Sequence, residues 1–410
     1  MNRRAFVHAA AALAAGGPAL AAPARLRAGA AREEITPDLA RPVWLAGFNH
    51  GRSDRRAEGV HDPLYARALA LEVFGQPLVV VALDLIGFFR PQVESVRRRL
   101  RLVPPERTIF CATHTHSGPD TLGLWGPDER TPGVDPVYLQ RLEDRVVAAV
   151  EAAVRSLRPA RLIAGSRDIP AGVAHNLREP LLDPAVTALR FVAEDERTIA
   201  TLVHFGCHPE VMMEANRLVS ADFCGPALAR VEAEFGGIGL FVNGALGGMV
   251  TPQVRERTWA EVERVGRAVG ETAIAALRGR PPIAVDRFRF ARAEVTLPLA
   301  NERFRQLAAA GLLRGVRFDG EVPTEVVHLA IGPVRIATVP GEILPRPGLE
   351  LKRRLGGEFP LVFSLANDEL GYLLHPDDFD RDLFRYERSM SVGPETWPRL
   401  REAAVRLLEN

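Results

Sequence analysis

The sequence predicts an α/β fold, with a mixed β-sheet core flanked by helices on both sides, in a single large domain. Two observations lead to this prediction. Short apolar runs rich in β-branched residues alternate along the chain with longer segments whose apolar residues recur at helical spacing. The 410 residues also contain no internal repeat, no low-complexity linker and no clear break in composition.

The expected strands are apolar, β-branched runs bounded by turn residues. In chain order they cover residues 77–87, 107–115, 160–169, 186–193, 198–209, 239–248 and 361–368, with two more within 324–339 around Gly332 and Pro333. The expected helices are amphipathic segments. They cover residues 91–103, 137–157, 226–236, 258–279 and 395–410. Helices between strands favour parallel neighbours and the hairpin-like pairs favour antiparallel ones, so the sheet is expected to be mixed.

Composition limits the classes of partner. The chain is 47% hydrophobic and 25% charged, and its formal net charge is +1. With balanced charge and 7% aromatic residues, it has neither the basic surface nor the stacking platform of a nucleic-acid-binding protein. Beyond the first residues, no stretch approaches the roughly 18 apolar residues of a membrane-spanning helix. We expect a soluble protein that binds a small molecule or a lipid; peripheral membrane contact and the oligomeric state stay open.

Residues 1–21 are typical of a twin-arginine signal peptide. Arg3 and Arg4 precede an alanine-rich apolar stretch, and residues 19–21 (Ala-Leu-Ala) fit a small-residue cleavage site. The alternative is an alanine-rich helix of the mature protein. The signal interpretation predicts export of a folded protein to the periplasm or the medium, and it leaves residues 22–410 as the mature domain.

Three cysteines lie in this mature region, namely Cys111, Cys207 and Cys224. An odd number cannot pair completely within one chain, and the spacings are not those of a structural zinc site. We expect buried, small apolar residues, with one optional disulfide.

Candidate functional residues lie where expected strands end. His114 and His116 follow the apolar part of the strand at 107–115, and residues two apart in an extended chain point to the same side. A single buried histidine is usually structural, but this pair can face one pocket as metal ligands or acid/base groups. His208 ends the strand at 198–209. We assign His208 to the site and His204 to strand packing, because the β-branched run before them favours a strand over a helix.

Two polar loops follow later strands. Glu342 follows the strands within 324–339, and Tyr372 follows the strand at 361–368 in the run NDELGY. Each loop alone is an ordinary polar turn. Together with the histidines they could complete a site of nitrogen and oxygen ligands. Such a site suits Zn²⁺, whose catalytic sites keep one position open for water.

Taken in order, these motifs resemble the neutral/alkaline ceramidase family, specifically its N-terminal catalytic domain. The resemblance is carried by THTHSGP at 113–119, the later His-Pro, the Pro-Gly-Glu loop and NDELGY. GVHDPLYARALAL, VSADFCGPA and YERSMSVGP extend it over nearly the whole mature chain. The resemblance implies a zinc amidase that cleaves the N-acyl bond of ceramide.

The resemblance also implies roles for individual residues. The implied ligands of one Zn²⁺ per chain are His114, His208, Glu342 and Tyr372. His116 then lies beside the metal as an acid/base group. Arg178 could hold a polar or anionic substrate group. Asn176 and Arg178 correspond to the family's Asn-Arg pocket motif, here interrupted by Leu177. A further Ca²⁺ or Mg²⁺ stays open.

The chain departs from the family in two places. The family's G-D-x-S-P motif appears, within the loop Gly247-Gly248-Met249-Val250-Thr251, with methionine in place of aspartate and Thr251 at the serine position. The chain also ends at Asn410 without the family's C-terminal immunoglobulin-like domain. Both departures favour a substrate other than ceramide.

The expected reaction is hydrolysis of an N-acyl bond by attack of a zinc-bound water, whose pKa the metal lowers from about 15.7 toward about 7. His116 would shuttle a proton or stabilise the oxyanion. Asp84 and Asp222 could orient the ligand histidines, or else be solvated or helix-capping aspartates. The alternatives are a metallohydrolase of the same scaffold acting on a non-sphingolipid amide, ester or lactone, and a non-catalytic binding protein.

Overall fold

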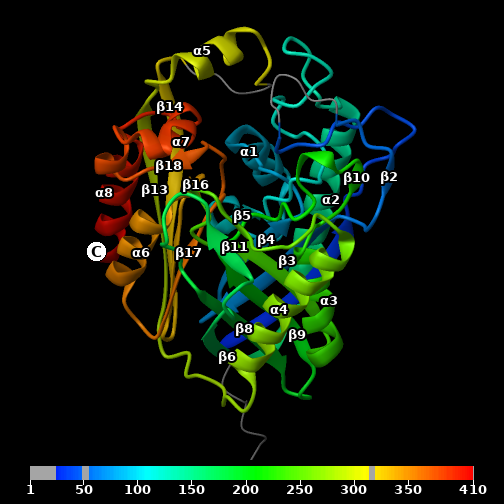
Figure 1. Ribbon diagram of the computed structural model, residues 1–410. Helices are drawn as coiled ribbons and strands as arrows, with labels where there is room; N and C mark the ends of the chain where they lie inside the picture. Colours follow the sequence, from blue (N-terminus) through cyan, green and yellow to red (C-terminus); the bar gives the residue numbers. More distant parts are fainter. Residues whose placement is uncertain (1–24, 49–54, 314–318, 410) are drawn as a thin grey trace, which may run out of the picture.

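Two β-sheets stacked face to face form the centre of the protein (Figure 1). The computed structural model describes residues 25–48, 55–313 and 319–409, so the expected signal peptide at 1–21 lies outside the described residues. Side chains from both sheets share one hydrophobic core, with Leu71 and Val80 on the larger sheet and Leu329, Ile336 and Leu361 on the smaller. Apolar burial of this kind is the main force that holds the two sheets together.

The larger sheet has eight strands in the order β11-β9-β8-β6-β1-β3-β4-β5. They are β1 (Leu26–Glu34), β3 (Tyr65–Val73), β4 (Gln76–Leu83), β5 (Thr108–Ala112), β6 (Arg158–Asp168), β8 (Ala185–Ala193), β9 (Thr198–Phe205) and β11 (Ile238–Asn243). The pairs β4–β5 and β9–β11 are parallel and the other neighbours are antiparallel. The predicted mixed sheet is therefore confirmed.

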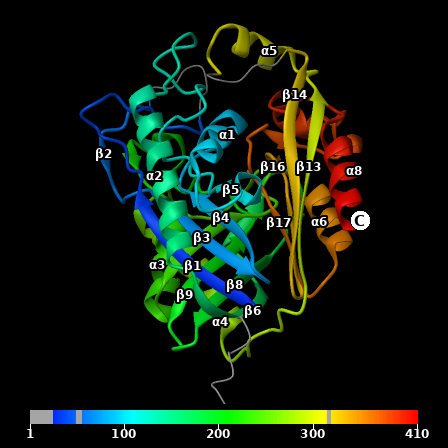
Figure 2. The same ribbon diagram turned by 180° about the vertical axis from the view of Figure 1, so that it is seen from behind.

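Helices cover the outer face of this sheet (Figure 2). They are α1 (Arg90–Arg99), α2 (Pro136–Arg155), α3 (Cys224–Phe235) and α4 (Trp259–Leu277). The long helix α2 packs on β1 and β3, and α4 packs on β6 and β8. Helix α2 begins at Pro136 because Asp135 accepts a hydrogen bond from the Val137 amide at 3.0 Å, and proline fits the first helical turn.

The smaller sheet has four strands in the order β13-β14-β15-β17. They are β13 (Phe288–Pro298), β14 (Glu321–Ile331), β15 (Val334–Thr338) and β17 (Phe359–Phe363). Helices α6 (Pro345–Leu355) and α8 (Thr396–Glu409) cover its outer face. The layers therefore run helix, sheet, sheet, helix. The prediction of helices on both sides is confirmed, although they flank a pair of sheets.

Short elements connect these layers. They are β2 (Gly59–Val60), β7 (Ala174–Asn176), β10 (Leu218–Val219), β12 (Val250–Pro252), β16 (Glu342–Ile343), β18 (Tyr372–Leu373), α5 (Glu302–Ala309), α7 (Arg385–Ser389), and the 3₁₀ turns Pro105–Arg107, Met213–Ala215, Pro376–Asp378 and Asp382–Phe384. Cys111, Cys207 and Cys224 are buried, free thiols, and burial raises the pKa of each. Among the described residues, no helix is long and apolar enough to cross a membrane.

Candidate active site

Loops that follow strands of both sheets meet around one pocket. His114 follows β5 and His208 follows β9 of the larger sheet, while Glu342 follows β15 and Tyr372 follows β17 of the smaller. The pocket has an empty volume of about 900 Å³, counting the space open to solvent. Its lining includes both histidines of the THTHSGP run, Glu342 and Tyr372, among many apolar side chains. Residues far apart in the sequence thus converge on one place.

His114 is held with one ring nitrogen available. Its backbone is left-handed, with φ of 68°, and its amide donates to Leu85 O at 2.9 Å. The ring Nδ1 lies 2.6 Å from Ile86 O. A proton on Nδ1 satisfies that carbonyl, so the lone pair of Nε2 is left for the pocket. A carbonyl that fixes the tautomer in this way is the usual environment of a metal-binding histidine.

His208 has the same arrangement. Its Nδ1 lies 2.9 Å from Val250 O, and its Nε2 lies 2.9 Å from Oε2 of Glu342. His114 Nε2 lies 3.4 Å from the same oxygen. Burial alone would lower the pKa of His208, but the hydrogen bond and charge of Glu342 and the charge of Glu210 raise it to about 9. Burial would raise the pKa of Glu342, yet the two histidines hold it well below its usual range.

The donor set fits a metal ion. Nε2 of His114, Nε2 of His208 and Oε2 of Glu342 converge, and the raised pKa of His208 indicates that the group favours a positive charge between its members, which a proton or a metal ion can supply. The ring nitrogens of His114, His116 and His208 lie within 4.8 Å of one another, a spacing that could hold a metal ion. This group includes His116, which the sequence interpretation placed beside the metal. Nitrogen and carboxylate ligands of this kind suit Zn²⁺.

A short ribbon places Glu342 beside Tyr372. Strands β16 and β18 pair in parallel, with these two residues in register. Gly341 permits the close approach, because a Cβ there would lie 2.4 Å from Gly371 O. The Tyr372 hydroxyl donates to Met249 Sδ at 3.5 Å. Burial and the charge of Glu342 raise the pKa of Tyr372 well above its ordinary value.

His116 is a buried histidine of the pocket wall. Within the described part of the chain, neither nitrogen has a hydrogen-bond partner. Nδ1 lies 3.5 Å from Oε2 of Glu210. Burial and the charges of His114 and His208 lower the pKa of His116 well below its ordinary value. The backbone here is fixed, since Arg55 donates to His116 O at 2.8 Å.

The Asn176–Arg178 segment lies behind the altered loop. The Leu177 amide donates to Met249 O at 3.1 Å, and Asn176 Oδ1 accepts from the Arg178 amide at 2.8 Å. The Arg178 guanidinium donates to the buried carboxylate of Glu387 at 2.8 Å and does not line the pocket. Thr251 is buried beside Glu210. Burial raises the pKa of the Glu210 carboxyl, and the Thr251 hydroxyl opposes this shift.

The two aspartates are bonded to partners other than the histidine rings. Asp84 pairs with Arg67 and accepts from the Tyr65 amide at 2.9 Å, and burial raises its pKa. Asp222 accepts from the Phe223 amide at 2.7 Å, and burial raises its pKa to about 7. Among the described interactions, neither carboxylate is hydrogen-bonded to a site histidine. Both hold the backbone around the site.

Two glutamates of the pocket were not singled out from the sequence. Glu210 and Glu369 both line it and are buried, and each has one carboxylate oxygen without a hydrogen-bond partner among the described residues. The signal for Glu210 was available, because it directly follows His208-Pro209. The apolar wall was not predictable from motifs, because loops from the whole chain supply it. It includes Phe48, Ile86, Phe89, Leu122, Leu124, Trp125, Phe304, Leu370, Met390 and Val392.

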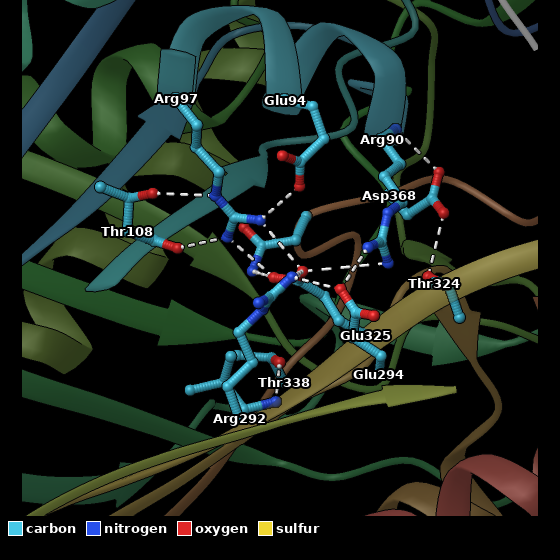
Figure 3. A network of polar contacts seen from close by, with 12 residues as sticks. Arg90, Glu94, Arg97, Thr108, Arg292, Glu294, Thr324, Glu325, Thr338 and Asp368 are labelled. Atoms are coloured by element: carbon cyan, nitrogen blue, oxygen red, sulfur yellow. Dashed lines mark hydrogen bonds and ion pairs between the residues drawn. The ribbon is translucent and has the colours of Figure 1, made fainter. Parts of the chain in front are cut away.

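A buried ionic network braces the loop that carries Tyr372 (Figure 3). Glu325 on β14 accepts two hydrogen bonds from Arg97 on α1, at 2.8 and 3.0 Å, and one from Arg292 Nε on β13 at 2.8 Å. Asn367 donates to the same carboxylate at 2.7 Å and accepts from the Phe110 amide at 2.8 Å. Asp368, the next residue, accepts from the Arg90 amide at 3.0 Å. The loop is thereby fixed to both sheets.

Comparisons with known proteins identify the family of this chain. The family model described as neutral/alkaline non-lysosomal ceramidase, N-terminal, matches residues 26–240, which is more than half of the chain. The chain belongs to this ceramidase family. Among curated relatives, the neutral ceramidases of Pseudomonas aeruginosa and Mycobacterium tuberculosis are 28% and 27% identical over 236 and 216 residues.

The chain corresponds to part of these ceramidases. The two matches cover 50% and 46% of this chain and 34% and 33% of the relatives, so the aligned part is about a third of their length. The crystal structure of the Pseudomonas aeruginosa enzyme matches 95% of this chain and 75% of its own, with a TM-score of 0.79 at 20% identity. A ceramidase described as complexed with C2 covers 94% of this chain and 76% of its own, with a TM-score of 0.78 at 19% identity. At such identities the structures show a shared fold.

Proposed function

We propose that this protein is a zinc-dependent amidohydrolase that cleaves an N-acyl bond, as a ceramidase does. The observation that carries the proposal is the convergence of His114 Nε2 and His208 Nε2 on Oε2 of Glu342, at 3.4 and 2.9 Å, in the wall of a pocket. These three residues and Tyr372 would hold the ion. When bound, Zn²⁺ would supply Lewis acidity to the amide carbonyl and lower the pKa of a water.

His116 and Glu210 act as the proton-handling pair in this proposal. His116 is neutral, and its Nδ1 lies 3.5 Å from the Glu210 carboxylate. A neutral imidazole can take a proton from the attacking water, and the carboxylate then stabilises the imidazolium that forms. The same proton can pass to the leaving nitrogen.

The apolar wall supports an acyl chain as part of the substrate. Phe89, Leu122, Trp125 and Phe304 line the pocket, and burial of an alkyl chain against such side chains is favourable. Met249 supports a second candidate, a non-sphingolipid amide, ester or lactone, because it occupies the aspartate position of the family motif at the pocket wall. Arg178 is engaged by Glu387 and contributes as a brace behind the pocket.

The experiment combines metal analysis with matched substrates. Purified protein is expected to contain about one zinc per chain, and His114→Ala and His208→Ala are expected to lose both the metal and amide hydrolysis. Release of fatty acid from a short-chain ceramide is compared with release of acetate from small N-acetyl compounds. His204→Ala is the control, since its ring lies against Val362 O between the sheets. Metal-free protein with unchanged hydrolysis in both ligand variants would overturn the proposal.

We also propose that the chain is exported. The proposal rests on Arg3 and Arg4 and the alanine-rich stretch that follows them. Replacement of both arginines by lysine is expected to retain the protein in the cytoplasm, as cell fractionation would detect. Unchanged export of that variant would refute the proposal that residues 1–21 direct export.

A further inference from the structure

The carboxylate of Glu369 has no role in the reaction described above. It lies in the loop between β17 and β18, its side chain lines the pocket, and the residue is 7% exposed. Oε1 accepts a hydrogen bond from the Gly371 amide at 3.1 Å. Oε2 has no hydrogen-bond partner among the residues that the structure describes. A buried carboxylate oxygen without a partner costs free energy, so a ligand group that pairs with it would be favoured.

The structure fixes Glu369 in this position. Its amide donates to Asp368 Oδ1 at 3.0 Å, and Asp368 Oδ2 accepts from the Thr324 hydroxyl at 2.9 Å. Gly87 makes room for the side chain, because a Cβ there would lie 2.8 Å from Cγ of Glu369. The carboxylate therefore cannot easily turn away from the pocket to find water. A rigid polar group inside an apolar pocket is the usual means by which a site selects its ligand.

The charges of the pocket select for a cation. Three carboxylates line it, those of Glu210, Glu342 and Glu369, and no lysine or arginine does so within the described segments. Burial and the neighbouring charge of Glu342 raise the pKa of Glu369 well above its ordinary value, so the empty pocket favours the neutral acid, and an ammonium that pairs with Oε2 would favour the carboxylate. Glu342 would be neutralised by the metal ion, whereas Glu369 lies outside the implied ligand set. An anionic ligand would meet repulsion here, and an ammonium would meet attraction.

We propose that Glu369 is a specificity-determining residue that binds an ammonium group of the ligand, so that the pocket takes cationic amphiphiles in preference to anionic ones. The apolar wall contacts the alkyl part and the Glu369 carboxylate contacts the charged group. The substrate class is then an N-acyl compound whose amine portion carries a positive charge. The inferred substrate class rests on the proposed amidase function. The preference of the pocket for cationic over anionic ligands does not depend on that function.

The binding test uses metal-free protein and three probes of eight carbon atoms each: n-octylamine, n-octanol and octanoate. Calorimetry is expected to show that octylamine binds at least about tenfold more tightly than octanoate. Glu369→Gln keeps the shape of the side chain and is expected to reduce that ratio about tenfold, with octanol binding unchanged. Glu321→Gln, at the exposed start of β14, is the matched control and is expected to bind as the wild type does.

The outcomes separate the two proposals. Equal binding of octylamine and octanoate, or an unchanged ratio in Glu369→Gln, would overturn the role of Glu369 whether or not the protein is an amidase. The turnover test compares zinc-loaded enzyme on amides that share one acyl chain and carry an ammonium, a hydroxyl or a carboxylate on the amine side. If none of these amides is hydrolysed, the amidase function is contradicted, and the role of Glu369 is then decided by the binding test alone. Hydrolysis independent of charge would overturn the specificity.

Discussion

One oxygen atom organises the candidate site at the scale of single residues. Oε2 of Glu342 faces the Nε2 atoms of both His114 and His208, and each histidine satisfies a backbone carbonyl through its other nitrogen. This arrangement is the one expected of histidines that can bind a metal ion. His204 is the contrast: its Nε2 lies 2.8 Å from Val362 O, and no carboxylate is among its hydrogen-bond partners in the described chain. Two histidines four residues apart thus have different environments because one ends the strand and the other lies within it.

A buried histidine outside the candidate site predicts how the stability of the protein depends on pH. His328 on β14 is buried, and burial, together with the charges of Arg289 and Arg335, lowers its pKa to about 4. The unfolded chain binds a proton at about pH 6.5, whereas the folded protein does not until about pH 4. Stability is therefore complete above about pH 6.5 and falls as the pH decreases toward 4.

The measurement is urea unfolding at pH 7 and at pH 5. We expect the wild type to lose about 1–2 kcal/mol from this histidine over that interval, and His328→Leu to lose correspondingly less. Burial lowers the pKa of His204 to about 4 as well, so the variant keeps part of the acid sensitivity. An identical pH response in wild type and variant would show that His328 is not the titrating group.

The Glu325 network is the main feature at the scale of elements. It joins α1, on the outer face of the larger sheet, to β13 and β14 of the smaller sheet and to the loop before β18 (Figure 3). A buried carboxylate with two arginines costs desolvation, which these hydrogen bonds offset. The arginines hold the pKa of Glu325 below its usual range against the effect of burial. The network therefore fixes how the loop of Tyr372 lies relative to β5.

Replacement of this carboxylate tests the coupling. Glu325→Gln removes the buried counter-charge of Arg97 and Arg292, which keep only their ion pairs with Glu94 and Glu294, so we expect a loss of about 3–5 kcal/mol of unfolding free energy. Folded variant protein is also expected to bind zinc more weakly, because Tyr372 is less well placed. Glu294→Gln is the control, since Glu294 contacts Arg90 and Arg292 from the surface and should cost less than about 1 kcal/mol. Equal effects of the two substitutions would contradict the role of the network.

Local sequence patterns predicted the individual helices and strands better than they predicted how the two sheets pack together. Runs such as 77–87 and 137–157 carried their own periodicity, and they became β4 and α2 with ends shifted by a few residues. Strand β1 was missed because Leu26–Glu34 is built of alanine, glycine and charged residues, which have low strand propensity, and it is held by pairing with β3 and β6. Helix α6 was missed because two prolines occupy its first turn.

The same limit applies to the site. His114, His116, His208, Glu342 and Tyr372 were predicted as one group because each belongs to a motif at the end of an expected strand. The structure places four of them in the wall of one pocket, and His208 contacts Glu342 directly behind that wall. Asp84 was also at a strand end, but its position is set by Arg67 on the neighbouring strand β3. Such a partner is known only once the strand order is known. Motifs predicted the polar residues, and tertiary packing decided the apolar wall.

At the scale of the whole molecule, the candidate ligands connect the two sheets. His114 and His208 extend from strands of the larger sheet, and Glu342 and Tyr372 extend from the smaller one, at one end of their shared core. An ion held by all four would therefore bind the folded arrangement of both sheets and not the unfolded chain. Such binding must stabilise the whole protein by mass action.

Metal removal tests this connection. For an ion present at about 100 times its dissociation constant, the stabilisation is about 2.7 kcal/mol, so a chelator is expected to lower the melting temperature of zinc-loaded protein by a few degrees. His208→Ala already lacks a ligand and should show no response to the chelator. Arg178→Lys, which alters the brace to Glu387 but no candidate ligand, should respond as the wild type does. If the chelator strips zinc from the wild type and the melting temperature does not change, the ion does not link the two sheets, and the four residues do not form one site in the folded protein.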